Sequence, residues 1–193
     1  MKIIKYFFEF VSIISLFCIF KIIGLKNASN LGSILGRFIG PLFRSKKITK
    51  QNIKVGLGNL DEKKEKEIIN GMWSNIGRTF AEYIFLKDFK FNKTNFDHIK
   101  INGTNYLNEI KTTNKPVVFF SCHLANFELM AMELDKFSIK CAAIYRPLNN
   151  IFLNPLMEYL RIDENYKKNI NCLKIVVEIE NRNQFIEEIK KVI

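Results

Sequence analysis

The sequence predicts an α/β protein in which an N-terminal membrane helix is followed by a mostly parallel sheet flanked by helices. Three observations support this prediction. An apolar run opens the chain at residues 6–25, short runs rich in Val, Ile and Phe alternate with helical patterns over residues 96–145, and the connections between them are short. Strands that alternate with helices across short connections are typical of parallel sheets with right-handed crossovers.

The apolar run at residues 6–25 is interrupted only by Glu9 and Lys21. A spanning helix needs about 20 apolar residues, so this segment is long enough to span a bilayer or to lie partly in its interface. A secretory signal peptide is the alternative, but residues 27–29 form a poor cleavage site. Basic residues follow the run and predict that the rest of the chain stays cytoplasmic: Arg37, Arg44, Lys46, Lys47, Lys50 and Lys54.

The charge of the chain is concentrated near its N-terminus. The net charge is +11, and residues 1–60 contain ten Lys and Arg side chains but a single acidic residue, Glu9. A basic block beside an apolar segment indicates contact with anionic lipid headgroups. Nucleic acid is the alternative partner, and no recognition motif accompanies the charge. Four scattered cysteines and two histidines favour neither a disulfide framework nor a metal site.

Two helical patterns precede the predicted sheet. Residues 31–58 begin with apolar residues at helical spacing, and Pro41 should kink or end this helix. The helix either packs on the domain or lies on the bilayer. Asp61 should cap the next helix, whose first turn is rich in glutamate and whose apolar face is expected to pack in the core.

The strand patterns follow in order. Residues 96–101 and 117–121 should form strands on either side of a helix at 105–111, and a second helix should begin near Asn126. Residues 139–145 should form the next strand. A last strand and helix are expected at 173–179 and 182–192.

His123 lies where the predicted strand at 117–121 gives way to a helix, and Glu128 follows five residues later. Ligands of open α/β sheets bind in the crevice outside the carboxyl ends of the strands. Residues five apart on one continuous helix diverge by about 140°. His123 and Glu128 can therefore meet only if His123 precedes the helix and Glu128 lies in its early turns.

Four blocks around this motif carry a family resemblance. They are NIGRTFAEY (75–83), INGTNYL (101–107), the His-x4-Glu motif itself, and IYRPLNN (144–150) with NPLMEYLR (154–161). In this order they resemble the Kdo-dependent lauroyl/myristoyl acyltransferases of lipid A biosynthesis, within the glycerolipid acyltransferase superfamily. The family is longer than this chain and has a later DQ block. We therefore expect a membrane anchor at residues 1–27 and a partial acyltransferase domain at 28–193, with the sheet incomplete at the C-terminus.

The resemblance implies transfer of a fatty acyl group from an acyl carrier protein thioester to a hydroxyl of a lipid A precursor. It also implies a bacterial inner-membrane protein with its catalytic domain on the cytoplasmic face, and it calls for no cofactor, metal or nucleic acid. A lysophospholipid or another glycolipid is the alternative acceptor. The other alternative is a truncated, inactive membrane-associated remnant.

The resemblance implies a functional role for each site residue, and each residue also has a simpler structural interpretation. His123 would be the general base and Glu128 would orient it, whereas a buried histidine is the plainer reading. Arg146 would bind a substrate phosphate or the oxyanion, or it is a surface arginine. Asn126 would contact substrate or cap the helix. Covalent catalysis by Ser121 or Cys122 is disfavoured because no G-x-S-x-G elbow is present.

Overall fold

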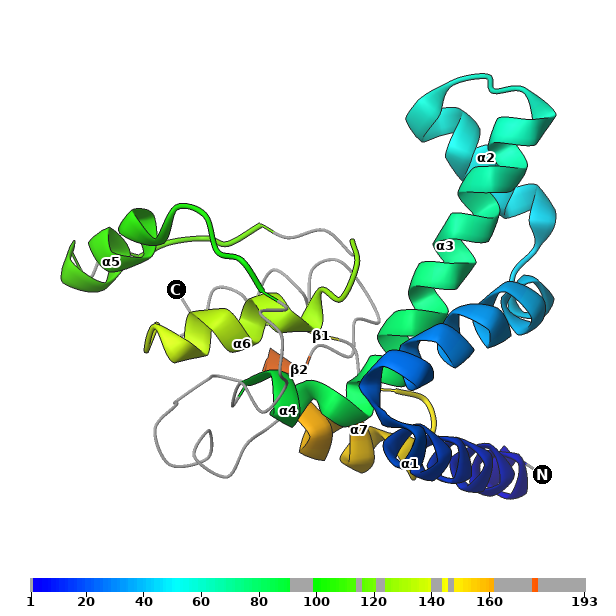
Figure 1. Cartoon of the computed structure of the whole chain (residues 1–193), viewed down its shortest axis with the longest axis horizontal. Helices are drawn as coiled ribbons and strands as arrows, with labels where there is room; N and C mark the ends of the chain where they lie inside the picture. The colour runs from blue at the N-terminus through cyan, green and yellow to red at the C-terminus, as the bar shows by residue number, and fades with distance from the viewer. Residues whose placement is uncertain are drawn as a thin grey trace. The chain divides into compact units, whose positions relative to one another are not determined.

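The computed structural model describes residues 2–90, 99–113, 116–120, 124–139, 144–145, 148–161 and 175–176. These residues are mostly helical (Figure 1). The chain divides into two compact units, which we describe separately. Unit 1 comprises Met1–Ser12, Leu86–Ser121 and Glu128–Ile193, and unit 2 comprises Ile13–Phe85 and Cys122–Phe127.

The long apolar helix α1 (Lys2–Phe43) is broken at one residue. Gly24 has φ 79° and ψ 164°, so two helical segments meet there. Only glycine adopts this backbone region readily. Pro41 lies inside α1, which ends two residues later at Phe43. The helical pattern predicted over residues 31–58 is confirmed in α1 and in the next helix at Lys46–Leu57, and the predicted end near Pro41 is confirmed.

Unit 2 continues with α2 (Lys46–Leu57), α3 (Glu62–Glu82) and the short 3₁₀ helix η1 (Tyr83–Phe85). Asp61 caps α3 as predicted: its carboxylate accepts a hydrogen bond from the backbone N–H of Lys64 at 2.8 Å. Glu62 and Glu65 lie in the first turn, where negative charge is favoured by the helix dipole. The beginning of α3 is therefore set by local sequence.

A row of small residues brings α1 and α3 into close contact. Gly32, Gly36 and Gly40 recur at every fourth position of α1 and face Gly77 and Trp73 of α3. A Cβ atom added at Gly77 would collide with the Gly32 carbonyl oxygen, and one added at Gly32 would lie 2.7 Å from the Cβ of Ala81. The two backbones can approach this closely only because these positions lack side chains.

The apolar core of unit 2 surrounds the same two helices. Phe20 is fully buried, and the ring of Phe17 packs on that of Phe80 with a centroid distance of 5.1 Å. Other buried apolar residues of this unit are Ala28, Trp73, Ala81, Tyr83 and Phe85. The apolar segment from Ile13 to Phe43 thus contributes directly to the core that α3 completes.

Unit 1 contains helices α4 (Leu86–Lys90), α5 (Thr104–Thr113), α6 (Glu128–Lys136) and α7 (Leu153–Arg161). Helix α4 packs against α6 and α7. Two two-residue strands, β1 (Ile144–Tyr145) and β2 (Ile175–Val176), pair in parallel. The helices expected at 105–111 and from about Asn126 correspond to α5 and α6.

The predicted mostly parallel sheet is wrong for the part of the chain that the structure describes, where extended pairing is limited to β1 and β2. Residues 116–120 have no regular structure, and Val118 and Phe120 are 76% and 92% exposed. A strand is stable only with neighbours that supply ladder hydrogen bonds, and no such neighbour lies among the described residues. Residues 99–101 of the expected strand at 96–101 also have no strand structure, and only Ile175–Val176 of the expected strand at 173–179 is described, as β2. The remaining expected strand and helix positions lie outside the described residues: 96–98, 121, 140–143, 173–174, 177–179 and 182–192.

Asn150 ties the first turns of α1 to α7 within unit 1. It is buried, and its Nδ2 donates to the Tyr6 carbonyl at 2.9 Å and to the Glu9 carboxylate at 3.0 Å. Its Oδ1 accepts from the backbone N–H groups of Phe152 and Leu153, which caps α7. Glu9, the acidic residue within the apolar run, thus has Asn150 as a specific hydrogen-bond partner.

Candidate functional site

Two of the four predicted site residues lie in the described chain. His123 and Arg146 lie outside the described residues. Glu128 is the first residue of α6, and Asn126 lies in the turn just before it. Glu128 therefore begins a helix, as the expected geometry of a His-x4-Glu pair requires, and its distance from His123 remains a prediction.

Asn126 forms a hydrogen bond to α3. Its Nδ2 donates to Oε2 of Glu82 at 3.0 Å across 44 residues of sequence. Because a carboxylate oxygen can only accept here, the bond fixes which end of the amide faces Glu82. The Oδ1 atom is buried and has no partner among the described residues.

The neighbouring residue Ala125 is held by the same helix. The Thr79 hydroxyl donates to its carbonyl oxygen at 3.1 Å, and Nδ2 of Asn75 approaches the same oxygen at 3.5 Å. Thr79 is buried. Ala125 has φ 46°, a left-handed conformation that costs a residue with a Cβ about 1–2 kcal/mol. The backbone just after His123 is thus held in an unusual conformation by side chains of α3.

Glu82 also joins α3 to α1. Its Oε1 accepts from the Ser29 hydroxyl at 2.8 Å, and Ser29 in turn accepts from Nη1 of Arg78 at 3.1 Å. The same Arg78 nitrogen donates to Asn30 Oδ1 at 3.0 Å. Both oxygens of the Glu82 carboxylate are therefore used, one toward α1 and one toward the loop that contains Asn126.

Sequence reasoning did not identify Glu82, Thr79 or Ser29 as functional candidates. Glu82 and Thr79 lie inside the block at residues 75–83, which carried the family resemblance as a whole. The signal that could have found them is spacing. Residues 75, 79 and 82 recur at i, i+4 and i+7, which places three polar side chains on one face of a helix.

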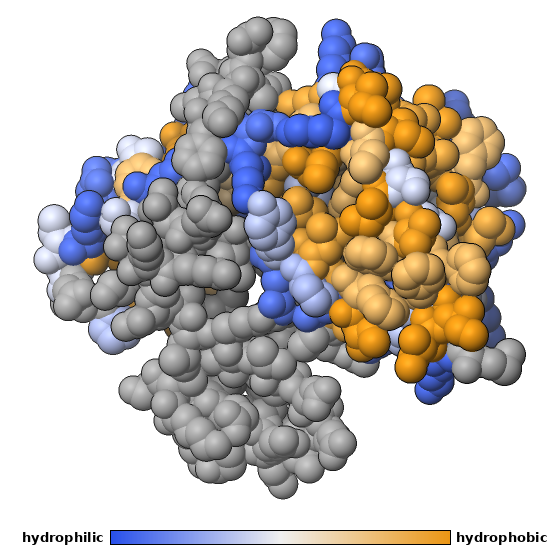
Figure 2. Space-filling model, turned by 90° about the horizontal axis from the view of Figure 1, so that it is seen from below, coloured by the Kyte–Doolittle hydropathy of each residue, from blue (hydrophilic) through white to orange (hydrophobic). Residues whose placement is uncertain are grey.

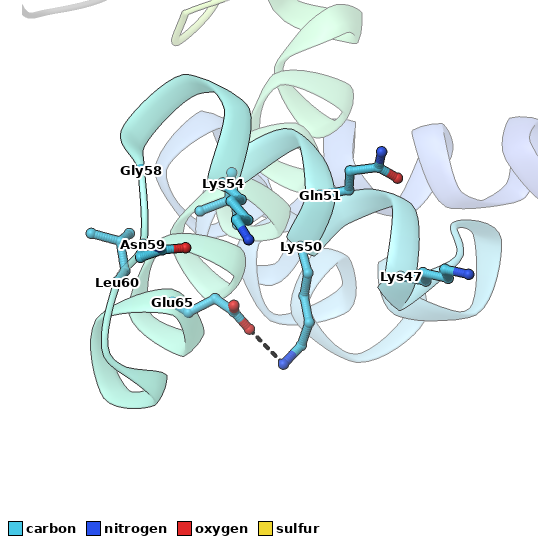
Figure 3. A pocket seen from close by; sticks show the side chains of 9 residues that line it. Lys47, Lys50, Gln51, Lys54, Gly58, Asn59, Leu60 and Glu65 are labelled. Carbon is cyan, nitrogen blue, oxygen red and sulfur yellow. Dashed lines mark ion pairs between the residues drawn. The ribbon is translucent and has the colours of Figure 1, made fainter.

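A second feature of unit 2 is a basic pocket between α2 and α3 (Figure 3). The cavity is about 420 Å³ and is lined by Lys47, Lys50 and Lys54 of α2 together with Glu65 of α3. Figure 3 shows Lys50 reaching toward Glu65, with Nζ 2.7 Å from Oε1. The hydrogen bond to Glu65, and then the charge of that carboxylate, raise the pKa of Lys50 above 10.5. The pocket therefore combines three lysine ammonium groups with one carboxylate, which is paired with Lys50.

The apolar surface of α1 is extensive. Among the described residues, α1 alone is long and apolar enough to cross a membrane. The segment before Gly24 would measure about 33 Å at 1.5 Å per residue, close to the thickness of a bilayer core. Figure 2 shows apolar side chains gathered over a broad area of the described surface. The exposed apolar residues of α1 include Ile3, Ile4, Phe7, Phe8, Val11, Ile19, Ile22, Phe38, Leu42 and Phe43.

The described residues contain no group of three or more His, Cys, Asp or Glu side chains arranged to hold a metal ion. Besides the basic pocket, unit 2 contains a hydrogen-bonded group in which Ser29, Arg78 and Glu82 join Asn126, and Thr79 bonds the Ala125 carbonyl beside it.

Comparison with known proteins gives one match. The sequence model of the family described as bacterial lipid A biosynthesis acyltransferase matches residues 1–190. The resemblance in the sequence depended on the blocks at residues 75–161. The match extends beyond these blocks toward both ends of the chain. No curated protein and no solved structure matches the chain.

Proposed function

The chain belongs to the bacterial lipid A biosynthesis acyltransferase family, and from this premise we propose that it transfers a fatty acyl group from acyl carrier protein to a hydroxyl of a lipid A precursor at the inner membrane. The family match over residues 1–190 is the observation that carries the proposal. Acyl transfer is the activity of the family, whereas the donor, the mechanism and the membrane attachment are proposed for this chain.

In the proposed mechanism His123 takes the proton of the acceptor hydroxyl as its oxygen attacks the thioester carbonyl. The C–O bond forms, the C–S bond breaks, and His123 returns the proton to the departing thiolate of the carrier. A histidine is suited to both steps because its pKa lies near neutral pH. Glu128 would orient the ring and stabilise the imidazolium. Its position at the start of α6 supports this role.

Arg146 is proposed to bind an acceptor phosphate or the developing oxyanion, where a guanidinium gives strong, directional hydrogen bonds. Asn126 is proposed as a second contact, through Oδ1. No metal or dissociable cofactor enters this mechanism. The lysines of α2 support docking of the acidic carrier protein on the basic N-terminal part of the chain.

The proposed anchor is residues 1–27, with the acyltransferase domain at 28–193 on the cytoplasmic face. The length and apolar character of α1 support membrane attachment. The basic residues that follow Gly24, among them Arg37, Arg44 and Lys46, support the cytoplasmic orientation. Fusions of green fluorescent protein and of alkaline phosphatase to the C-terminus test it: fluorescence without phosphatase activity is expected, and the opposite pattern would refute the orientation.

The activity test uses membranes that contain the full chain, labelled acyl carrier protein and a Kdo-bearing lipid A precursor. Product is expected, and it should fall at least 100-fold in His123→Ala and in Glu128→Gln. The matched control is His98→Ala, which alters the second of the two histidines and should leave activity unchanged. Product that survives His123→Ala would refute the mechanism. Lysophospholipid acceptors in parallel reactions distinguish the alternative substrate class.

A further inference from the structure

We propose that Glu82 is a positioning residue of the acyl transfer reaction: from α3 it holds the loop that carries His123. This inference rests on the proposed function of His123. It assigns to Glu82 a role that acts through Asn126 and the backbone of the loop, without contact to the substrate.

The first support is the pattern of contacts between α3 and the loop. Thr79 and Glu82 bind two consecutive loop residues, through the Ala125 carbonyl at 3.1 Å and the Asn126 side chain at 3.0 Å. One bond reaches the backbone and the other a side chain. Two attachments one residue apart fix both the position and the orientation of the chain, which a single bond would leave free to rotate.

The second support is covalent proximity. His123 precedes Ala125 by two residues, so a chain of at most about 7 Å separates their Cα atoms. General base catalysis needs the imidazole within hydrogen-bond distance of the acceptor hydroxyl, and a displacement of about 1 Å can cost 100-fold in rate. The bonds to Ala125 and Asn126 therefore hold the described chain two to three residues from the proposed base.

The third support is the strain at Ala125. Its φ of 46° is unfavourable for alanine and persists only where the surroundings enforce it. The enforcing groups are the Thr79 hydroxyl on the Ala125 carbonyl and the Glu82 carboxylate on the next side chain. Strain of this kind concentrates at functional sites, and here it lies two residues after the proposed general base.

Glu82 could instead serve only to join α3 to α1, since its other oxygen accepts from Ser29. The two roles use different oxygens, so they can be separated. Ser29→Ala removes the bond to α1 and leaves the bond to Asn126. Glu82→Gln keeps one acceptor oxygen for two donors, so it can keep at most one of the two bonds unchanged.

The experiment compares kcat and KM of the full chain in membranes. For Glu82→Gln we expect kcat to fall 10- to 100-fold, with KM for acyl carrier protein changed less than twofold. Ser29→Ala should keep kcat within about twofold of the wild type. The double variant Glu82→Gln/Asn126→Asp exchanges donor and acceptor and restores the hydrogen bond, so its kcat should exceed that of Glu82→Gln at least threefold.

A second measurement does not need catalysis. Diethyl pyrocarbonate modifies histidines, and the chain has only His98 and His123. Mass spectrometry after timed exposure gives a rate for each. We expect Glu82→Gln to raise the rate at His123 threefold or more and to leave His98 unchanged, whereas Ser29→Ala alters neither.

The results that would overturn the inference are specific. Equal losses of kcat in Glu82→Gln and Ser29→Ala would assign Glu82 to helix packing alone. An unchanged His123 modification rate in Glu82→Gln would also refute it. Activity that survives His123→Ala would refute the proposed mechanism instead, so the two failures are distinguishable.

Discussion

The side-chain amide of Asn150 donates a hydrogen bond to the carboxylate of Glu9 at 3.0 Å, across 141 residues of sequence. The same amide reaches the Tyr6 carbonyl, and its oxygen caps α7. Phe152 adds ring contacts to Phe7 and Phe10, with centroid distances of 5.9 and 6.0 Å. The first turns of α1 are therefore bound to the loop before α7 by polar and aromatic contacts together.

Asn150→Ala should destabilise the protein by about 3 kcal/mol, because it removes a helix cap worth about 1 kcal/mol and two donated hydrogen bonds of similar value. Thermal unfolding followed by circular dichroism in mild detergent measures the loss. The control is Asn149→Ala: this neighbour is exposed, and its loss should cost less than about 0.5 kcal/mol. Equal effects of the two variants would contradict the assigned role of Asn150.

Gly77→Ala should destabilise the protein by about 3 kcal/mol, at the upper end of overpacking effects, because the new methyl group collides with the backbone of α1 at Gly32. The control lies in the same helix. A Cβ at Gly71 meets no atom within 4 Å, so Gly71→Ala should stabilise α3 by about 0.5–1 kcal/mol. Opposite shifts of the unfolding temperature are expected, and a stabilising Gly77→Ala would show that α1 and α3 do not cross closely.

Gly24→Ala should cost about 2 kcal/mol although the site has open space, because φ 79° with ψ 164° is almost confined to glycine. The alternative outcome is a continuous α1, which would reveal itself as added helical signal in circular dichroism. Gly56→Ala is the control: Gly56 lies in α2 with no atom near its Cβ position, and alanine there should be stabilising.

The pairing of Lys50 with Glu65 should give a small contribution to stability that is lost at alkaline pH. The pKa of Lys50 is raised above its usual 10.5 by the hydrogen bond to Glu65, so the contribution is fully present below pH 10.5 and disappears as pH rises through the higher folded value. Lys50→Gln should therefore lower the unfolding temperature slightly at pH 8, and its curve should converge with that of the wild type once the pH exceeds the folded-state pKa of Lys50. A difference that grows with pH would contradict this assignment.

The helices could be predicted because their signals are local. Asp61 and the glutamates after it determine where α3 begins, and Pro41 lies within two residues of the end of α1. The sheet could not be predicted reliably in the same way. The sequence of residues 117–121 is typical of a strand. A strand also needs hydrogen-bond partners from distant parts of the sequence, and the described part of the chain supplies none for Val117 to Phe120.

The candidate site shows the same limit. The order of the sequence blocks identified the family, and the helix that begins at Glu128 was expected. The bonds from Glu82 to Ser29 and Asn126 join residues 53 and 44 positions apart, and no local pattern encodes such a pairing. Glu82 lies at the end of a helix that was predicted to pack in the core, and nothing in the sequence around it indicated a role in the site. Its hydrogen-bond partners gave that indication.

The contribution of α1 to both units bears on how the protein can be produced. Membrane proteins are often trimmed of their hydrophobic leader to obtain a water-soluble catalytic fragment. Here the same trimming at residue 27 would remove Phe17 and Phe20 from the core beside α3 and would leave Asn150 without Tyr6 and Glu9. The apolar segment is part of the folded protein, so purification should retain it, in detergent or nanodiscs, and an expressed fragment should not begin at its end.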